Sequence, residues 1–328
     1  MRALVTGGGG FLGRYIVERL VARGDIVRVL GRQPHPELEK LGIETIQADI
    51  RDLESVTNAC RTIDIVFHVA AKVGHWGRWK EFSGINYVGT KNIVEGCKTH
   101  NVPRLVYTST PSVVFDETDL CDVDETYPYP ARYKSYYAET KAMAEKHVIA
   151  ANGNGGLVTV VLRPHLVWGP RDNHLIPALL LRARKNQLMM VGDGKNKVDV
   201  SYVENVADAH LLAGDRLREN SAVAGQVYFI SQGEPVYLWD FLNELLVRLN
   251  IPEVKKRVSF GVARFAGGIL ELIYKSFPLK SEPRITRFLA AQMSYSHFFN
   301  ISKAKRDLAY QPRISTSEGL ERLINSLQ

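Results

Sequence analysis

The chain has 328 residues, of which 45% are hydrophobic and 23% are charged, and its formal net charge is +7. This composition is typical of a globular protein with a sizeable core and excludes a disordered chain. No run of five like charges and no stretch of about 18 uncharged apolar residues occurs, so neither a nucleic-acid-binding arm nor a transmembrane helix is expected. The basic excess suits a phosphate-bearing cofactor, an anionic substrate or an acidic surface, but the favoured interpretation is an ordinary solvated surface.

The start of the chain lacks the apolar segment of a signal peptide. Three scattered cysteines are too few for a disulfide framework or a zinc site, and the histidines have no compact metal-ligand spacing. We therefore expect a cytoplasmic protein that holds no metal and has no nucleic-acid partner.

Short apolar runs alternate with helical stretches through the first two-thirds of the chain. The expected strands are Ala3–Thr6, Ile26–Leu30, Glu44–Gln47, Ile63–His68, Arg104–Thr108 and Val158–Leu162. The expected helices include Phe11–Ala22, Phe82–Lys98 and Tyr133–Ala150. Each strand is apolar without polar alternation, as strands covered on both faces are. The pattern predicts an α/β fold with a doubly wound parallel sheet.

The alternation breaks after Leu162, where loops rich in proline and glycine separate helices. A return to the sheet is expected in Ser201–Ile230, with a helix at Val206–Leu217 and a strand at Gln226–Ile230. We therefore expect a dinucleotide-binding domain of residues 1–163 plus 198–232. Residues 164–197 plus 233–328 are expected to form a smaller, mostly helical substrate-binding domain.

Val258–Phe277 has the spacing of an amphipathic helix. Arg264 and Glu271 fall on one face, whereas Phe265 and Leu272 fall on the other. The ordinary interpretation is a helix that packs its apolar face on the core. A lid over an apolar substrate and a shallow membrane contact are the alternatives.

A glycine-rich loop follows the first expected strand and opens the first expected helix. Gly7 permits a tight turn, Gly10 lets the backbone approach a pyrophosphate, and Gly13 lets the helix pack close to the strand. Phe11 and Leu12 begin the helix, whose free N–H groups face the phosphates. This context predicts a Rossmann-type dinucleotide site.

The second strand is followed by Arg32, where a site that prefers NAD usually has a carboxylate for the ribose 2′-hydroxyl. A guanidinium at this position can hold a 2′-phosphate, which favours NADP(H) over NAD(H). The alternative is a solvated turn residue in a site that does not select between the two cofactors.

Two Tyr-x-x-x-Lys patterns occur, Tyr87/Lys91 and Tyr137/Lys141, and their positions separate them. Tyr137 and Lys141 follow a strand that ends in hydroxyl side chains, at the sheet edge where doubly wound proteins bind ligands. A nearby ammonium is expected to lower the phenol pKa, so that Tyr137 exchanges a proton with a carbonyl oxygen during hydride transfer. Thr110 is expected to hydrogen-bond the same oxygen. Tyr87 is assigned to helix packing.

These motifs, in this order, resemble the extended short-chain dehydrogenase/reductase family over nearly the whole chain. Asp49-Ile50 is similar to the family's adenine contact, and the resemblance places Ala70, Ala71 and Lys72 beside the cofactor. The family's Asn-x-x-Gly-Thr-x-Asn helix is matched from Asn86 to Asn92. The segment from Arg163-Pro164 to Gly169-Pro170 is similar to the loop near the nicotinamide, so Pro164 is a cofactor contact by resemblance. Thr110 stands where many members have Ser, which keeps the hydroxyl and adds a methyl group.

Within the family, the chain resembles the 3β-hydroxysteroid dehydrogenase branch and, more narrowly, bacterial enzymes that reduce 2-alkyl-3-oxoalkanoic acids in olefin biosynthesis. This resemblance implies reduction of a 3-oxo group on an apolar substrate, which Trp76, Ser109, Phe115 and His165 would contact. A sterol dehydrogenase, a nucleotide-sugar epimerase and a non-catalytic NADP(H) sensor are the alternatives. A dehydratase is disfavoured, because no acidic pair follows Thr110. Many relatives pair through the helices that carry Asn86 and Tyr137, which implies a homodimer.

Overall fold

The computed structural model describes residues 1–277 and 281–328 and is built around a sheet of seven parallel strands. The strand order is β12-β7-β5-β4-β1-β2-β3. The strands are β1 (Arg2–Thr6), β2 (Ile26–Gly31), β3 (Glu44–Gln47), β4 (Ile65–His68), β5 (Arg104–Thr108), β7 (Val158–Pro164) and β12 (Val227–Ile230). The direction of winding reverses between β1 and β4, which confirms the doubly wound sheet and places the ligand crevice at this point.

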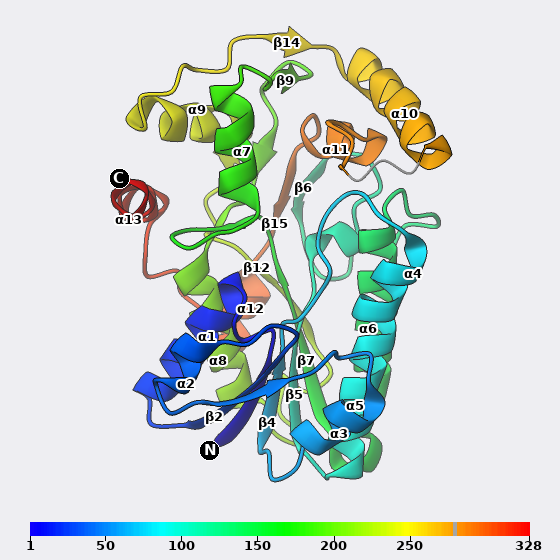
Figure 1. Ribbon diagram of the computed structural model, residues 1–328, viewed down its shortest axis with the longest axis vertical. Helices are drawn as coiled ribbons and strands as arrows, with labels where there is room; N and C mark the ends of the chain where they lie inside the picture. Colours follow the sequence, from blue (N-terminus) through cyan, green and yellow to red (C-terminus); the bar gives the residue numbers. More distant parts are fainter. Residues whose placement is uncertain (278–280) are drawn as a thin grey trace.

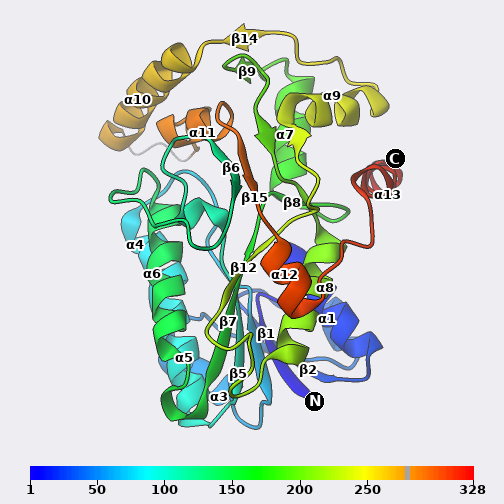
Figure 2. The same ribbon diagram turned by 180° about the vertical axis from the view of Figure 1, so that it is seen from behind.

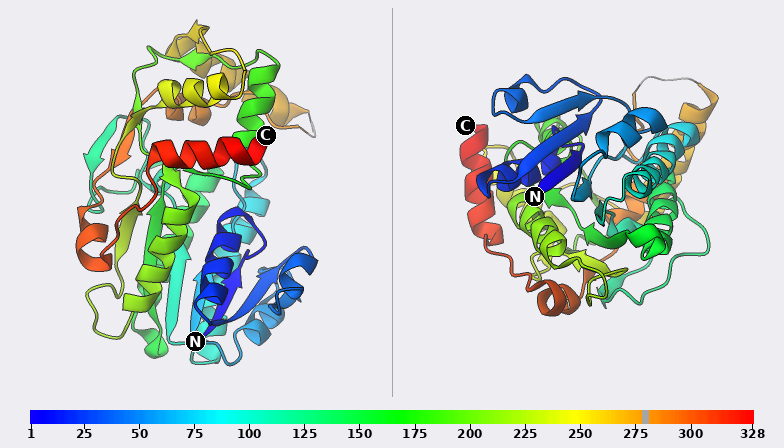
Figure 3. Two further views of the ribbon diagram at one scale, coloured as in Figure 1. Left: turned by 90° about the vertical axis from the view of Figure 1, so that its left-hand side faces the viewer. Right: turned by 90° about the horizontal axis from the view of Figure 1, so that it is seen from below.

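Helices cover both faces of this sheet (Figure 1). One face carries α3 (Leu53–Ala59), α5 (Gly89–Thr99) and α6 (Tyr136–Ala151). The other carries α1 (Phe11–Ala22) and α8 (Val203–Arg216), while the short α2 (Pro36–Glu39) lies beside β3. Two clusters of buried apolar side chains fill the spaces between the sheet and the two helix layers. The view from below in Figure 3 shows the sheet between these layers.

The expected helix Phe82–Lys98 is composed of three consecutive parts. These are α4 (Trp79–Phe82), the π-helical stretch η1 (Ser83–Val88) and α5. π-Helical turns inside helices are frequent at functional sites, and this one carries Asn86. Neither a propensity nor an apolar period distinguishes such a turn, so the sequence could not have predicted it.

A smaller lobe lies above the carboxyl edge of the sheet (Figure 2). Its four-stranded sheet has the order β13 (Val236–Tyr237), β10 (Lys197–Val198), β15 (His297–Phe299) and β6 (Leu120–Val123). The lobe also contains two strand pairs. These are β8 (Val167–Trp168) with β11 (Ser201–Tyr202) and β9 (Met190–Val191) with β14 (Arg257–Val258). The helices of this lobe are α7 (Leu175–Arg184), α9 (Leu238–Arg248), α10 (Phe260–Ser276), α11 (Arg287–Gln292) and α13 (Thr316–Leu327).

Helices make up most of the regular structure of this lobe, as expected, and short strands that the sequence did not indicate join them. The strands have two to four residues each, which is too short for a visible apolar period.

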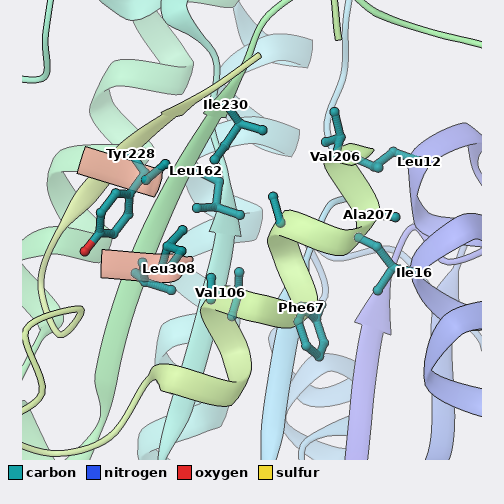
Figure 4. Packing of buried hydrophobic residues seen from close by; sticks show 14 of the residues in the cluster. Leu12, Ile16, Phe67, Val106, Leu162, Val206, Ala207, Tyr228, Ile230 and Leu308 are labelled. Atoms are coloured by element: carbon teal, nitrogen blue, oxygen red, sulfur yellow. The ribbon is translucent and has the colours of Figure 1, made fainter. Parts of the chain in front are cut away.

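The C-terminal part of the chain returns once more to the large domain. Helix α12 (Ser302–Leu308) packs on α8 and β12, and Leu308 and Tyr310 belong to the core cluster of the central sheet. Figure 4 shows Leu308 close to Tyr228 of β12 and Leu162 of β7. Residues 302–310 thus lie on the dinucleotide-binding side, although the sequence division assigned them to the substrate-binding domain.

Helix α10 has its apolar face outward. Phe265 and Leu272 are exposed, whereas Glu271 and Gly267 on the opposite face are buried. The expectation that this apolar face packs on the core is therefore wrong. Polar partners inside the lobe hold the other face, as described below. No helix in the part of the chain that the structure describes is long and apolar enough to cross a membrane.

Candidate active site

The glycine loop between β1 and α1 forms a narrow cradle at the switch point of the sheet. Gly7 has a φ of 69°, and a Cβ there would lie 3.0 Å from the Cα of Ala70. A Cβ on Gly13 would lie 2.1 Å from the Gly7 carbonyl oxygen. Gly10 donates its N–H to the same oxygen at 2.9 Å and is the N-cap of α1, with no side chain to cover the helix terminus. The amides of Phe11 and Leu12 therefore begin a helix whose end can accept a pyrophosphate.

A buried hydrogen-bond chain supports the segment that passes beside this cradle. The Thr6 hydroxyl lies 2.7 Å from Nδ1 of His68, and Nε2 of His68 lies 2.9 Å from the Thr90 hydroxyl. Asn86 accepts from the backbone N–H of Lys72 at 2.7 Å and donates to its carbonyl at 3.0 Å. Burial lowers the pKa of His68 to about 3, so its ring is neutral and its role is structural. The path through Ala70, Ala71 and Lys72 is thus fixed by side chains below it.

The Lys72 ammonium does not face the cradle, since it pairs with Glu81 at 3.1 Å. At the far end of β2, Arg32 is exposed. The Asp49 carboxylate pairs with Arg51 at 2.7 Å, and this hydrogen bond holds the pKa of Asp49 below its usual value.

Ile50 is buried beneath α5, where a Cβ on Gly89 would lie 2.5 Å from the Ile50 side chain. Asn92 donates to the Ile50 carbonyl at 3.0 Å. Pro164 ends β7 in a fully buried position, in register with Ile230 of β12. Both residues therefore help to fix the backbone around the crevice.

Tyr137 and Thr110 come together where α6 meets the end of β5. Burial raises the pKa of Tyr137 to about 12, and the nearby Thr110 hydroxyl opposes this shift. Thr110 also accepts from the backbone N–H of Ser112 at 3.3 Å, which holds its hydroxyl at the start of a short 3-10 turn. The phenol is therefore protonated at neutral pH and can donate to an acceptor oxygen.

Lys141 lies one turn after Tyr137 on α6 and is 3% exposed. Its ammonium donates to the Thr108 carbonyl at 2.5 Å and lies 4.2 Å from the centre of the Tyr107 ring. Burial lowers the pKa of Lys141 to about 7, while the Glu145 carboxylate raises it. Lys141 is not among the causes of the Tyr137 pKa shift, since its ammonium is directed to Thr108 and Tyr107.

Glu145 continues the same helix face one turn further and is completely buried. It pairs with Arg163 of β7 at 2.5 Å and accepts from the Tyr129 hydroxyl at 2.6 Å. Ser109, on the strand end, also donates to Glu145. Sequence reasoning missed these partners, although the spacing of Tyr137, Lys141 and Glu145 in steps of four could have indicated Glu145.

A cavity of about 1170 Å³ lies between the two lobes, beside the start of α6. Its walls include the four residues that precede Tyr137, with Trp76 and Trp79 from the segment after β4, Tyr274 from α10 and Phe288 from α11. The ring of Trp79 meets that of Tyr136 edge-on, with centres 5.4 Å apart. The cavity has both aromatic and charged walls.

Of the four residues expected to contact substrate, only Trp76 lies among those lining this cavity. Phe115 is one layer deeper, with its ring against Phe288. Ser109 is buried against Glu145, as described above. His165 is buried, and its Nε2 lies 2.6 Å from Nδ1 of His297. In the other Tyr-x-x-x-Lys pattern, the ring of Tyr87 packs edge-on against His147 and lies against the core cluster.

A doubly wound sheet with a dinucleotide cradle, a half-buried tyrosine and a buried lysine on one helix face and an adjacent hydroxyl defines an oxidoreductase of the short-chain dehydrogenase type. The model of the 3-beta hydroxysteroid dehydrogenase/isomerase family matches residues 4–261, and the chain belongs to this family. A nicotinamide dinucleotide is accordingly its cofactor, and the glycine loop fits one, since Gly10 leaves the N-terminus of α1 without a side-chain cap.

Two relatives match almost the full chain. A 2-alkyl-3-oxoalkanoate reductase of Stenotrophomonas maltophilia is 44% identical over 326 residues, which cover 98% of each chain. A decarboxylating sterol-4-alpha-carboxylate 3-dehydrogenase of Mus musculus is 32% identical and covers 99% of this chain and 90% of its own. Among solved structures, the UDP-glucose 4-epimerase of Thermus thermophilus in complex with NAD has a TM-score of 0.76 at 25% identity. That match covers 99% of this chain and 98% of the epimerase.

Proposed function

We propose that the protein uses NADPH to reduce the 3-oxo group of a 2-alkyl-3-oxoalkanoic acid to an alcohol. The observation that carries the proposal is the contact between Tyr137 and Thr110 next to the large cavity between the lobes. The printed name of the bacterial relative, at 44% identity over nearly the full chain, supports the substrate class.

Bound NADPH would supply the hydride for the carbonyl carbon. Tyr137 gives its proton to the carbonyl oxygen as negative charge develops there, and the Thr110 hydroxyl holds that oxygen in place. Burial raises the pKa of Tyr137 to about 12, so the proton is present at neutral pH.

Arg32 supports NADPH as the cofactor. It directly follows β2, its side chain is exposed, and no carboxylate occupies the usual position for binding a 2′-hydroxyl. A free guanidinium at this place matches the geometry of a phosphate.

The two relatives share a feature of substrate chemistry in their names. Both names describe a carboxylate on the carbon beside the reacting C3 carbon. Arg78, Lys134 and Lys275 line the cavity and would favour such a carboxylate. A sterol carboxylate is therefore the second candidate substrate.

The test follows NADPH consumption with a long-chain 2-alkyl-3-oxoalkanoic acid, with NADH and a 4-carboxysterol ketone in parallel. Tyr137→Phe is expected to lower kcat by a factor of about 100 or more, because the proton donor is lost. Tyr87→Phe is the matched control, since Tyr87 has the same spacing to a lysine but packs against His147. Equal activity of the two variants would exclude Tyr137 as the acid. Turnover of the sterol ketone alone would replace the proposed substrate.

We further propose that the protein is a cytoplasmic homodimer that pairs through the helices that carry Asn86 and Tyr137, which are η1 with α5 and α6. The family resemblance supports the pairing, and three free cysteines, two of them buried, are consistent with a reducing compartment. Light scattering of the purified protein measures the mass that decides the oligomeric state.

A further inference from the structure

The N-terminus of α6 is part of the wall of the large cavity. The residues from Tyr133 to Tyr136 line the cavity, and Ser135 is the N-cap residue of α6. A serine at this position usually accepts a hydrogen bond from an amide of the first turn, but Ser135 makes no such bond. The N–H groups of Tyr136, Tyr137 and Ala138 have no acceptor within the described residues. This end of the helix therefore has unused donors beside the cavity.

The hydroxyl of Ser135 is a further unused group. Ser135 is only 6% exposed, and its Oγ has no hydrogen-bond partner in the part of the chain that the structure describes. An unpaired buried hydroxyl is unfavourable, and the large majority of such groups in proteins have a partner. The N-cap serines of α10 and α13 do accept from a first-turn amide, Ser259 from Val262 and Ser315 from Glu318. Ser135 lacks this bond, and a ligand in the cavity that it lines can supply the missing partner.

The charges around the cavity favour an anion at this place. Lys134, which precedes Ser135 in the chain, and Arg78 line the cavity, and no carboxylate of the described residues pairs with either. The 16-residue helix α6 adds the positive end of its dipole. Three of the four carboxylates in the walls are paired with cations, namely Glu81 with Lys72, Glu117 with Arg264 and Glu271 with Arg287, and the fourth is Glu282. An anionic group on a ligand is therefore more favourable at the start of α6 than a cationic one.

We propose that Ser135, Lys134 and the first turn of α6 bind the carboxylate of the substrate. Such a subsite rests on the proposed function, in which the substrate is a 3-oxo acid. The carboxyl carbon of this acid is two bonds from C3, so the carboxylate must lie beside the carbonyl that Tyr137 protonates. Side chains of a helix lean toward its N-terminus, which directs the phenol of Tyr137 to the end of α6 where Ser135 lies. Figure 1 shows this end of α6 next to α4, below the small lobe.

Each group of this subsite has its own role. The Ser135 hydroxyl and an amide of the first turn donate hydrogen bonds to the carboxylate oxygens, as helix N-termini do in other anion sites. The Lys134 ammonium adds an attraction between opposite charges, which salt weakens. Binding at this point holds one end of the substrate, so that its 3-oxo group meets Tyr137 and Thr110. The subsite therefore selects a 3-oxo acid over the corresponding ester.

The test compares a 2-alkyl-3-oxoalkanoic acid with its methyl ester in steady-state kinetics at low and high salt. A hydrogen bond to a charged group changes affinity by a factor of roughly 10 to 100. Ser135→Ala is therefore expected to raise the ratio of KM for the acid to KM for the ester roughly tenfold or more. Lys134→Gln is expected to raise the same ratio and to weaken its dependence on salt. A ratio that Ser135→Ala leaves unchanged overturns the proposal, because the hydroxyl then does not bind the carboxylate.

Ser315→Ala is the matched control, because Ser315 is also an N-cap serine but accepts from the Glu318 amide at 3.2 Å. This variant is expected to lower the melting temperature and to leave the KM ratio unchanged. Ser135→Ala removes no cap bond, so its melting temperature is expected not to fall. An equal rise of both KM values in Ser135→Ala, together with a lower melting temperature, would show a structural role and overturn the proposal.

A binding measurement separates the subsite from the proposed reaction. Calorimetry compares 2-hexyldecanoic acid with 2-hexyldecan-1-ol, neither of which has an oxo group that the protein could reduce. The wild type is expected to prefer the acid, and Ser135→Ala is expected to lose roughly tenfold of this preference. This result without turnover of any 3-oxo acid would support the subsite and reject the proposed function. Turnover of the 3-oxo acid by a wild type that does not prefer 2-hexyldecanoic acid would reject the subsite alone.

Discussion

Arg32 is the residue that the proposed cofactor choice depends on. Its guanidinium is exposed directly after β2, and a hydrogen bond to a charged phosphate contributes about 1.5–3 kcal/mol. Arg32→Asp is therefore expected to lower the ratio of kcat/KM for NADPH to that for NADH by roughly 10- to 100-fold. Steady-state kinetics with both cofactors measure this ratio.

Lys40→Asp provides the control, since it makes the same charge change on an exposed residue of the same lobe. If Arg32→Asp leaves the ratio of kcat/KM for the two cofactors unchanged, Arg32 does not bind the 2′-phosphate.

We expect Glu145 to act on the reaction through Lys141. Burial lowers the pKa of Lys141 from its usual 10.5 to about 7, and the Glu145 carboxylate raises it. The ammonium loses its proton as pH rises through about 7, so kcat/KM for NADPH should decline on the alkaline side from this value. Glu145→Gln removes the opposing charge and should move this decline to lower pH. The pH profile of kcat/KM, which reports groups of the free enzyme, measures the shift.

Glu139→Gln is the matched control on the same helix. Glu145→Gln also leaves Arg163 buried without its partner, which costs about 3–5 kcal/mol of stability. A smaller folded fraction lowers the height of the profile, whereas only a changed Lys141 pKa moves its midpoint. An unmoved midpoint would contradict the proposed role of Glu145.

The same pKa shift has a consequence for stability. Between pH 10.5 and about 7 the unfolded chain binds a proton at Lys141 that the folded chain does not. The contribution of this residue to stability therefore decreases as pH falls through that window and is least below it.

Sequence reasoning at the residue scale found the groups that stand in local patterns. The glycine positions and the spacing of Tyr137 and Lys141 are visible along the chain, because one turn and one helix determine them. The partners of Glu145 come from β7, the end of β5 and the loop with Tyr129. Their proximity depends on the order of strands in the sheet, which no local pattern encodes.

At the scale of elements, the junction between β1 and α1 allows little variation. A Cβ on Gly13 would meet the Gly7 carbonyl oxygen at 2.1 Å, and this oxygen belongs to the backbone and cannot turn aside as a side chain could. Gly13→Ala should displace α1, weaken NADPH binding at least tenfold and lower the melting temperature. Fluorescence titration with NADPH and thermal unfolding measure these effects.

Gly261→Ala on α10 is the comparison, since nothing lies within 4 Å of a Cβ there. A helical alanine at that position should be neutral or stabilising by up to about 1 kcal/mol. Equal losses in the two variants would show that the glycine loop tolerates a side chain.

The existence and type of the long elements could be predicted from the sequence. The orientation of α10, that is, which of its faces packs on the protein, could not. The apolar period of α10 correctly indicates a helix, and the usual assumption then places its apolar side inward. Here Glu271 and Arg264 have partners inside the lobe, and these partners come from other segments of the chain. A period defines which residues share a face and says nothing about which face meets the protein.

At the scale of the whole molecule, the parallel sheet could be predicted because each strand is buried on both faces and each crossover contains a helix. The return of α12 to this sheet and the pairing of β6 with β15 could not, since both join segments that are distant in sequence. Helix α13, red in the left panel of Figure 3, then passes back to α9 of the small lobe.

This repeated passage of the chain between lobes affects how the protein is made. A domain encoded by one continuous stretch can fold on the ribosome as soon as that stretch has emerged. Here the last strand of the central sheet ends at Ile230, and α12, which packs against it, ends at Leu308. The nucleotide-binding half therefore cannot complete its core until nearly the whole polypeptide has been synthesised. Until then the part of β12 that α12 covers is available to other nascent chains or to chaperones.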